Sequence, residues 1–243
     1  MDLKKFLLIG WFIFTGHACE QSDPFAYVDD YLKFRSQENV AGLTLDYALT
    51  VPEEYYSHPR PTPLIIALHY GGVTTIEAGS AFVDELVLPG LGGLQAIIAA
   101  PVSPTFGTWA SLSAERAIFG LIDTIQAHLQ VDTSRIVIMG YSMGANGAWY
   151  YAGKYPGRFA AVVAVSGNPS STNLQTFADL PIYIIHSRKD EIYPFAQVET
   201  AVNVLKSRGV EVYFKQLRQP GHYETTKFVN ALTDAGDWIA RRW

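Results

Sequence analysis

Short apolar runs recur along the chain, and segments with helical spacing separate them. Five runs are almost wholly apolar, namely 64–69, 96–101, 135–140, 160–167 and 181–186. A strand whose two faces are both buried reads as such a run, which is typical of parallel sheets. Helical spacing fills the intervals at 77–87, 112–129, 143–155, 195–208 and 225–241. The alternation predicts an α/β fold with a mostly parallel twisted sheet and helices on both faces.

The segments before and after these apolar runs have other patterns. Residues 43–52 alternate apolar and polar positions, as a half-buried antiparallel strand does, and 210–217 alternate in the same way. Residues 23–37 carry apolar side chains at helical spacing, so we expect a helix there. The sequence contains no internal repeat and no linker, which favours a single domain over residues 19–243.

The N-terminus has the pattern of a secretory signal peptide. Lys4 and Lys5 precede an apolar run at 6–14, and the small residues Gly16 and Ala18 follow it. The apolar run is too short to span a bilayer stably. We therefore predict that residues 1–18 are removed and that the protein is exported from a bacterial cell.

Cys19, the only cysteine, lies at the predicted cleavage site and has no partner for an internal disulfide. The site resembles a bacterial lipoprotein signal, in which this cysteine is lipidated and attaches the protein to a membrane. Gly16 stands where such signals usually have leucine, and Gly16-His17-Ala18 also suits ordinary cleavage after Ala18. Two destinations stay open, a lipoprotein of the cell envelope and a periplasmic or secreted protein.

Composition and charge exclude several classes of function. The 243 residues are 49% hydrophobic and only 17% charged, which suits a large folded core and argues against disorder. A net charge of −5 without a basic cluster gives no electrostatic support for nucleic-acid binding. The histidines, carboxylates and single cysteine do not have zinc-ligand spacing, so we predict neither a metal nor another cofactor.

The strongest chemical signal is Gly140-Tyr141-Ser142-Met143-Gly144, between the apolar run 135–140 and the predicted helix 143–155. A sharp turn from strand to helix forces the serine into a strained conformation and exposes its hydroxyl. Glycines on either side leave room for the close approach of the backbone. The pattern predicts that Ser142 is a nucleophile at a helix N-terminus.

A serine nucleophile needs a base and an acid, in the order serine, acid, histidine along this kind of chain. Only His222 follows Ser142 in a loop between a strand and a helix. Asp190 follows the strand 181–186 and is the predicted acid, with its neighbour Glu191 as the alternative. Asp179 precedes that strand and would lie at the wrong end of the sheet.

Acyl transfer also requires donors for the oxyanion, and we expect the backbone N–H of Met143 to be one. The second should come from the loop after 64–69, with Gly71 the expected donor and Tyr70 the alternative. Tyr70 also adds bulk beside this loop and is a candidate for the substrate pocket. Trp109, in the loop after 96–101, either lines that pocket or packs in the core.

Together these stretches resemble the α/β-hydrolase superfamily, and within it a group of secreted esterases and predicted peptidases related to phospholipase/carboxylesterase and polyhydroxybutyrate-depolymerase-like enzymes. The resemblance covers residues 43–242 and is carried by LDYALTVPEEY, PLIIALHYGG, VDTSRIVIMGYSMGANGAWYYAGKYPGRFAAVVAVSG, LPIYIIHSRKDEIYP and QPGHYE. It implies a serine hydrolase that cleaves a small-molecule carboxylic ester through an acyl-enzyme. The chain departs from the family at Tyr70 and Ser187, where glycine is usual, and at Ala145, where a second glycine often follows the motif.

Two other functions remain open at this stage. A peptidase or a thioesterase would use the same three side chains. A non-catalytic binding protein on the same scaffold would be expected to have lost one of Ser142, Asp190 and His222, and none is lost. The sequence does not indicate an oligomeric state.

Overall fold

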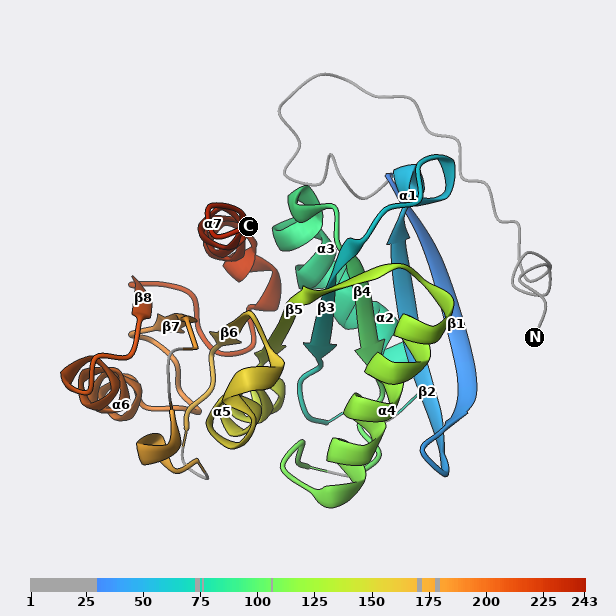
Figure 1. Cartoon of the computed structure of the whole chain (residues 1–243). Helices are drawn as coiled ribbons and strands as arrows, with labels where there is room; N and C mark the ends of the chain where they lie inside the picture. The colour runs from blue at the N-terminus through green and yellow to red at the C-terminus, as the bar shows by residue number, and fades with distance from the viewer. Residues whose placement is uncertain (1–29, 73–74, 76, 106, 170–171, 178–179) are drawn as a thin grey trace.

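The computed structural model describes residues 30–72, 75, 77–105, 107–169, 172–177 and 180–243 (Figure 1). Its centre is an eight-stranded sheet in the order β1-β2-β4-β3-β5-β6-β7-β8. The strands are β1 Tyr31–Val40, β2 Leu43–Pro52, β3 Thr62–Leu68, β4 Ile97–Pro101, β5 Val131–Tyr141, β6 Ala161–Val165, β7 Ile182–Ser187 and β8 Val212–Leu217. The last six of these are mutually parallel, and β1 and β2 join the sheet antiparallel. The predicted mostly parallel sheet is confirmed.

Helices cover both faces of the sheet. They are α1 Glu53–Ser57, α2 Glu77–Phe82, α3 Leu88–Leu91, α4 Leu112–His128, α5 Met143–Lys154, α6 Phe195–Ser207 and α7 Val229–Ala240. Figure 1 shows α4, α5 and α6 in front of the sheet and α2, α3 and α7 on the other side. Successive residues of a strand point to opposite faces, so Ile138 joins the core under α4 and α5 while Met139 joins the core under α7. This explains why the central strands are apolar throughout.

The prediction of a helix over 23–37 is wrong for the part of this range that the structure describes. Residues 31–40 form β1, which pairs with β2 along its whole length, from Tyr31 opposite Pro52 to Val40 opposite Leu43. The turn between the strands is Ala41-Gly42, and both residues have positive φ, as a two-residue hairpin turn requires. Pairing with a neighbouring strand has outweighed the local helical spacing of the apolar residues.

The predicted signal peptide at 1–18 and Cys19 lie outside the described residues. None of the helices in the described part of the chain is long and apolar enough to cross a membrane.

A buried carboxylate joins α4 to α5. Glu115 accepts hydrogen bonds from Tyr150, Lys154 and Tyr155, of which the Tyr155 bond measures 2.6 Å. Burial, the largest influence, raises the pKa of Glu115, but the three hydrogen bonds together outweigh it and hold the pKa below its usual value. The folded state therefore binds this proton less readily than the unfolded chain does, so the stabilisation is present at neutral pH and is lost on acidification.

Glu115→Gln is expected to lower the free energy of unfolding at pH 7 by about 2 kcal/mol, because charged hydrogen bonds become neutral ones. The difference from the wild type should shrink as the pH falls below the ordinary glutamate pKa of about 4.3. Urea unfolding across this pH range measures both effects. Glu199→Gln, which removes an exposed charge at 3.9 Å from Arg188, is the control and should change little. A difference that stays constant with pH would contradict the account.

Candidate active site

Ser142 lies at the turn between β5 and α5, with φ of 55° and ψ of −118°. The backbone is therefore in the strained region of positive φ that the sequence motif predicts. A Cβ on Gly140 would lie 2.1 Å from the Gly144 carbonyl oxygen, and one on Gly144 would lie 1.8 Å from the Leu68 carbonyl oxygen. Only glycine fits at either position, so both glycines are needed for the turn that exposes Ser142.

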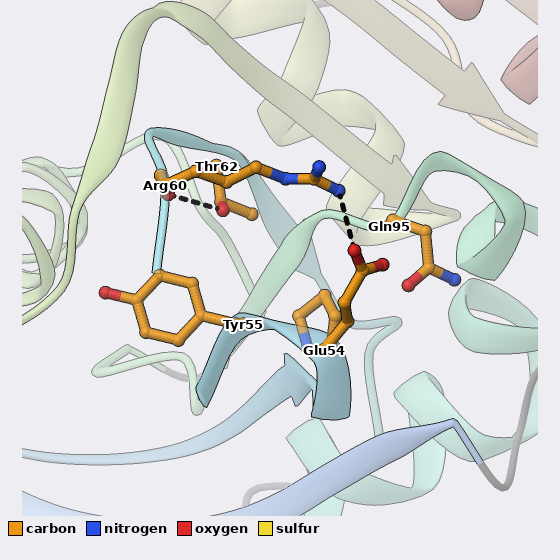
Figure 2. A pocket seen from close by; sticks show the side chains of 6 residues that line it. Glu54, Tyr55, Arg60, Thr62 and Gln95 are labelled. Carbon is orange, nitrogen blue, oxygen red and sulfur yellow. Dashed lines mark hydrogen bonds and ion pairs between the residues drawn. The ribbon is translucent and has the colours of Figure 1, made fainter. Parts of the chain in front are cut away.

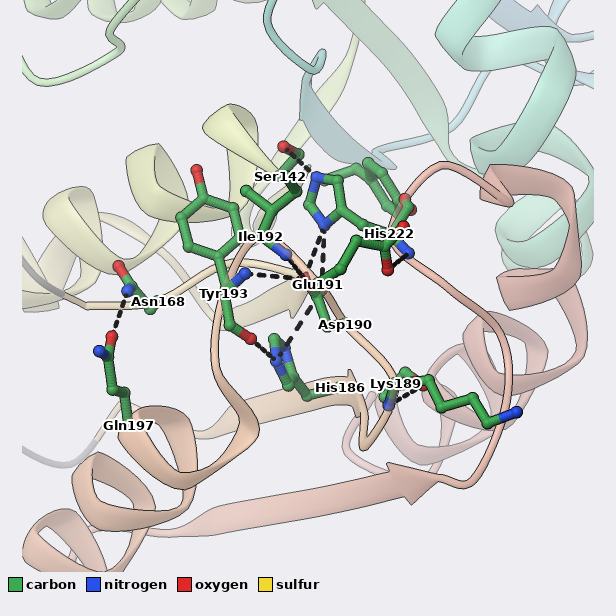
Figure 3. Close-up of polar contacts among 12 residues, drawn as sticks. Ser142, Asn168, His186, Lys189, Asp190, Glu191, Ile192, Tyr193, Gln197 and His222 are labelled. Atoms are coloured by element: carbon green, nitrogen blue, oxygen red, sulfur yellow. Dashed lines mark hydrogen bonds and ion pairs between the residues drawn. The ribbon is translucent and has the colours of Figure 1, made fainter.

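Three side chains from separate loops meet at this turn (Figure 3). The Ser142 hydroxyl oxygen lies 2.9 Å from Nε2 of His222, and the opposite ring nitrogen, Nδ1, lies 3.0 Å from each carboxylate oxygen of Asp190. Asp190 follows β7 and His222 follows β8. Because the carboxyl ends of parallel strands meet at one edge of the sheet, residues that are 80 positions apart come into contact.

Asp190 is 8% exposed and His222 is 4% exposed. Burial, the largest influence, raises the pKa of Asp190, but hydrogen bonds from His222 and from the backbone N–H groups of Tyr193 and Ile192 bring it below its usual value. Asp190 is therefore an anion at neutral pH, and the donor on His222 that faces it is Nδ1–H. In the neutral imidazole, Nε2 then carries no hydrogen and can accept the proton of the Ser142 hydroxyl.

His186 supports the Asp190 loop from below. It is fully buried at the end of β7, and its Nε2–H donates to the carbonyl oxygen of Tyr193 at 2.8 Å. Burial lowers the pKa of His186, so its ring is neutral. This histidine holds the turn that carries Asp190 and does not reach Ser142.

The predicted oxyanion donors lie next to each other. Met143 is the first residue of α5, where backbone N–H groups have no partner within the helix and the helix dipole favours negative charge. A Cβ on Gly71 would lie 3.5 Å from the sulfur and 3.6 Å from the Cβ of Met143. The loop after β3 therefore lies against the start of α5, as an oxyanion site requires.

This loop is held by a buried histidine. His69 donates from Nδ1 to the Tyr70 carbonyl oxygen at 2.6 Å and accepts at Nε2 from the backbone N–H of Ser103 at 3.0 Å. Trp109 donates from its indole nitrogen to the His69 carbonyl oxygen at 3.0 Å. Trp109 is only 1% exposed and belongs to the hydrophobic core, which favours core packing over a pocket wall.

Tyr70, the other candidate for the pocket, is half-buried. Its ring packs edge-on against Phe82 and Tyr141, and its hydroxyl donates to Glu85 at 3.1 Å. Tyr70 thus connects Tyr141, the residue before Ser142, to the π-helix Val83–Val87, which follows α2.

Two residues beside the predicted trio make contacts that sequence reasoning did not find. Glu191, the alternative acid, does not contact the His222 ring but accepts from the backbone N–H of His222 at 2.8 Å. The hydroxyl of Tyr141 donates to the carbonyl oxygen of His222. In the sequence, only the position of Glu191 next to Asp190 and of Tyr141 next to Ser142 could have indicated these contacts, because the contacts depend on how distant loops meet.

A small pocket lies far from these side chains. Figure 2 shows it between Glu54, Tyr55, Arg60, Thr62 and Gln95, at the start of β3 and hence at the opposite edge of the sheet from Ser142. Its volume of about 10 Å³ has room for one water molecule, so it is not a substrate site. Within the described residues, no group of three or more His, Cys, Asp or Glu side chains could hold a metal ion.

Comparison with known proteins identifies a family for the chain. The sequence model of a family described as phospholipase/carboxylesterase matches residues 112–235, a segment that includes Ser142, Asp190 and His222. No curated protein matches the chain significantly.

Several solved structures share the fold. A thermostable esterase superposes with a TM-score of 0.67 at 21% identity. The superposition includes 88% of this chain and 63% of the esterase chain. A ferulic acid esterase gives a TM-score of 0.71 at 16% identity over 88% of this chain and 97% of its own. An S-formylglutathione hydrolase from Agrobacterium tumefaciens gives 0.65 at 19% identity, over 87% and 95%. These similarities establish the α/β-hydrolase fold.

Proposed function

The chain belongs to the phospholipase/carboxylesterase family of serine hydrolases, and from this we propose that it cleaves carboxylic esters through an acyl-enzyme on Ser142. The observation that carries the proposal is the continuous hydrogen-bonded path from Ser142 through His222 to Asp190 at the N-terminus of α5. Serine, histidine and aspartate in this geometry are the general arrangement for nucleophilic acyl transfer.

The mechanism follows from the contacts. His222 Nε2 takes the proton of Ser142 as the hydroxyl oxygen attacks the ester carbonyl, and Asp190 stabilises the imidazolium that forms. The N–H groups of Met143 and Gly71 receive the negative charge on the carbonyl oxygen. His222 then gives its proton to the leaving alcohol. A water molecule, deprotonated by His222, attacks the acyl carbon, and the acid is released as the proton returns to the Ser142 oxygen.

An ester is proposed over an amide because an alkoxide is a better leaving group than an amide anion. The nitrogen of an amide must therefore be protonated before its bond to carbon breaks, which is a stronger demand on His222 than an ester makes. Turnover of an ester, a thioester and a peptide with the same acyl group separates the three reactions. We expect the ester to have the highest kcat/KM, and a preference for the peptide would contradict the proposal.

The alcohol part of the substrate should lie beside His222, because this residue protonates the leaving oxygen. Two apolar side chains are exposed there. Ile192 is 45% exposed, and Tyr223 is 76% exposed with its ring 5.3 Å from the imidazole. Ile192 lies in the Asp190 loop, where its backbone N–H donates to Asp190 at 3.0 Å (Figure 3). These side chains offer apolar contact to an alcohol larger than methanol or ethanol.

Tyr223→Ala is expected to raise KM for a benzyl ester about fivefold, because one aromatic contact contributes about 1 kcal/mol. KM for the ethyl ester of the same acid should change less than twofold. Steady-state kinetics on both esters gives the comparison. Tyr56→Ala, at an exposed tyrosine of α1, is the matched control. An equal rise for both esters would show that Tyr223 does not contact the alcohol.

We further propose that the protein acts outside the cytoplasm, after removal of residues 1–18. The basic, apolar and small residues of this segment support export, and Cys19 supports attachment to a membrane through a lipid. Fractionation of cells that express wild type and Cys19→Ala separates the two destinations. Loss of the variant from the membrane fraction indicates a lipoprotein, and an unchanged soluble fraction indicates a free exported protein.

A further inference from the structure

The backbone of His222 is bound on both sides by side chains that neighbour the other two members of the trio. Tyr141 precedes Ser142, and its hydroxyl donates to the His222 carbonyl oxygen. Glu191 follows Asp190, and its carboxylate accepts from the His222 N–H at 2.8 Å. The loops that carry Ser142 and Asp190 thus each contact His222 twice, once at its ring and once at its backbone.

We propose that Tyr141 and Glu191 are positioning residues that fix the backbone of His222, so that its ring stays between Ser142 and Asp190 while the proton moves. The inference rests on the proposed function, because it gives a role to side chains that do not touch the substrate.

The loop of His222 needs such support because its local bonds do not reach the histidine itself. Gly221 donates its N–H to Glu224 at 2.8 Å, and Glu224 donates its N–H to the Gly221 carbonyl oxygen at 3.3 Å. These bonds lie within the turn and do not connect it to the loops that carry Ser142 and Asp190. Tyr141 and Glu191 connect the turn to the rest of the site. A displacement of about 1 Å of a catalytic group can lower the rate about a hundredfold.

Tyr141 is a rigid support. It is the last residue of β5, is 2% exposed, and packs edge-on against Phe228 at 5.4 Å between ring centroids. Burial raises the pKa of its hydroxyl, so the group stays a donor at any pH at which the site works. Removing this hydroxyl leaves the ring packing intact, which makes Tyr141→Phe a narrow test.

The Glu191 carboxylate approaches the His222 loop at Gly221, a residue without a side chain. A Cβ on Gly221 would lie 3.1 Å and 3.3 Å from the two carboxylate oxygens of Glu191. Glycine at this position therefore leaves space for the carboxylate beside the His222 N–H. Glu191→Gln keeps an oxygen that can accept this hydrogen bond, whereas Glu191→Ala removes it.

The experiment compares Tyr141→Phe, Glu191→Ala and Glu191→Gln with two matched controls in the full chain. Tyr150→Phe removes a hydroxyl that donates to Glu115, away from the site, and Glu224→Ala removes the acceptor of the Gly221 N–H in the same turn. Steady-state hydrolysis of a p-nitrophenyl ester gives kcat and KM, and thermal unfolding gives Tm for each protein.

We expect Tyr141→Phe and Glu191→Ala to lower kcat about tenfold each while KM stays within about twofold, since the loss of one hydrogen bond misplaces the ring but not the substrate site. Glu191→Gln should retain at least about half of the wild-type kcat. Both controls should keep kcat within about twofold, although Tyr150→Phe lowers Tm.

The inference is overturned if kcat of Tyr141→Phe and Glu191→Ala equals that of the wild type, or if Tyr150→Phe and Glu224→Ala lower it as much. It is also overturned if the loss of kcat only follows the loss of folded protein. The wild type distinguishes these outcomes from a failure of the proposed function. An active wild type with unaffected variants refutes only the positioning role, whereas a wild type that hydrolyses no ester refutes both.

Discussion

Ser142→Ala is expected to abolish ester hydrolysis, with kcat lowered by at least about 10⁴-fold. The serine oxygen is the group that forms the covalent bond with the acyl carbon, and the methyl side chain of alanine cannot replace it. The hydroxyl contributes its bond to His222 at 2.9 Å and no packing in the core, so Tm should stay close to that of the wild type. Hydrolysis of p-nitrophenyl esters measures the loss.

Ser207→Ala is the control for this variant, because its hydroxyl donates to the Val204 carbonyl oxygen at the end of α6, away from Ser142. It should retain full activity. Full turnover by a folded Ser142→Ala variant would place the nucleophile elsewhere.

Asp190→Asn should lower kcat by about 10³- to 10⁴-fold with little change in KM. The carboxylate is held as an acceptor by the N–H groups of Ile192 and Tyr193 and by Nδ1–H of His222. An amide presents a donor to one of these groups, so the imidazole takes the other tautomer. Nε2 then carries hydrogen and cannot take the proton of Ser142.

The matched variant is Glu191→Gln, which makes the same change of carboxylate to amide one residue away. It should lower kcat by no more than about twofold, because Glu191 contacts the backbone of His222 and not its ring. Kinetics of the two variants therefore separates the two acids that the sequence leaves open. A larger loss for Glu191→Gln than for Asp190→Asn would reverse the assignment.

The central sheet was predictable because its strands are buried on both faces. Each of β3 to β7 contains a run of apolar residues, and from the sequence alone the ends of these strands place Ser142 and Asp190 at one edge of the sheet. The glycines of the turn were predictable for the same kind of reason, since backbone contact at Gly140 and Gly144 excludes a Cβ.

The first strand was not predictable from local spacing. Phe34 is a half-buried residue of β1, yet its spacing from Tyr31 also fits a helix. The decision between helix and strand comes from β2, which pairs with every residue from 31 to 40. Such pairing is a property of two segments together, and a window over one of them does not contain it.

Contacts between loops could not be predicted from the sequence either. Tyr141 and His222 are 81 residues apart, and Glu191 and His222 are 31 apart. Their bonds join side chains to backbone atoms, for which residue types give no signal. Trp109 is a similar case, because an indole in a loop after β4 suits both a pocket and a core, and its burial in the folded chain is what favours the core.

The most direct test of the central claim is labelling with a fluorophosphonate, which reacts covalently with an activated serine. Mass spectrometry of the intact protein and of its peptides locates and counts the adduct. The account predicts one adduct per chain, on Ser142, and loss of ester hydrolysis in proportion to labelling. Absence of an adduct on Ser142, or full hydrolysis by completely labelled protein, would contradict it.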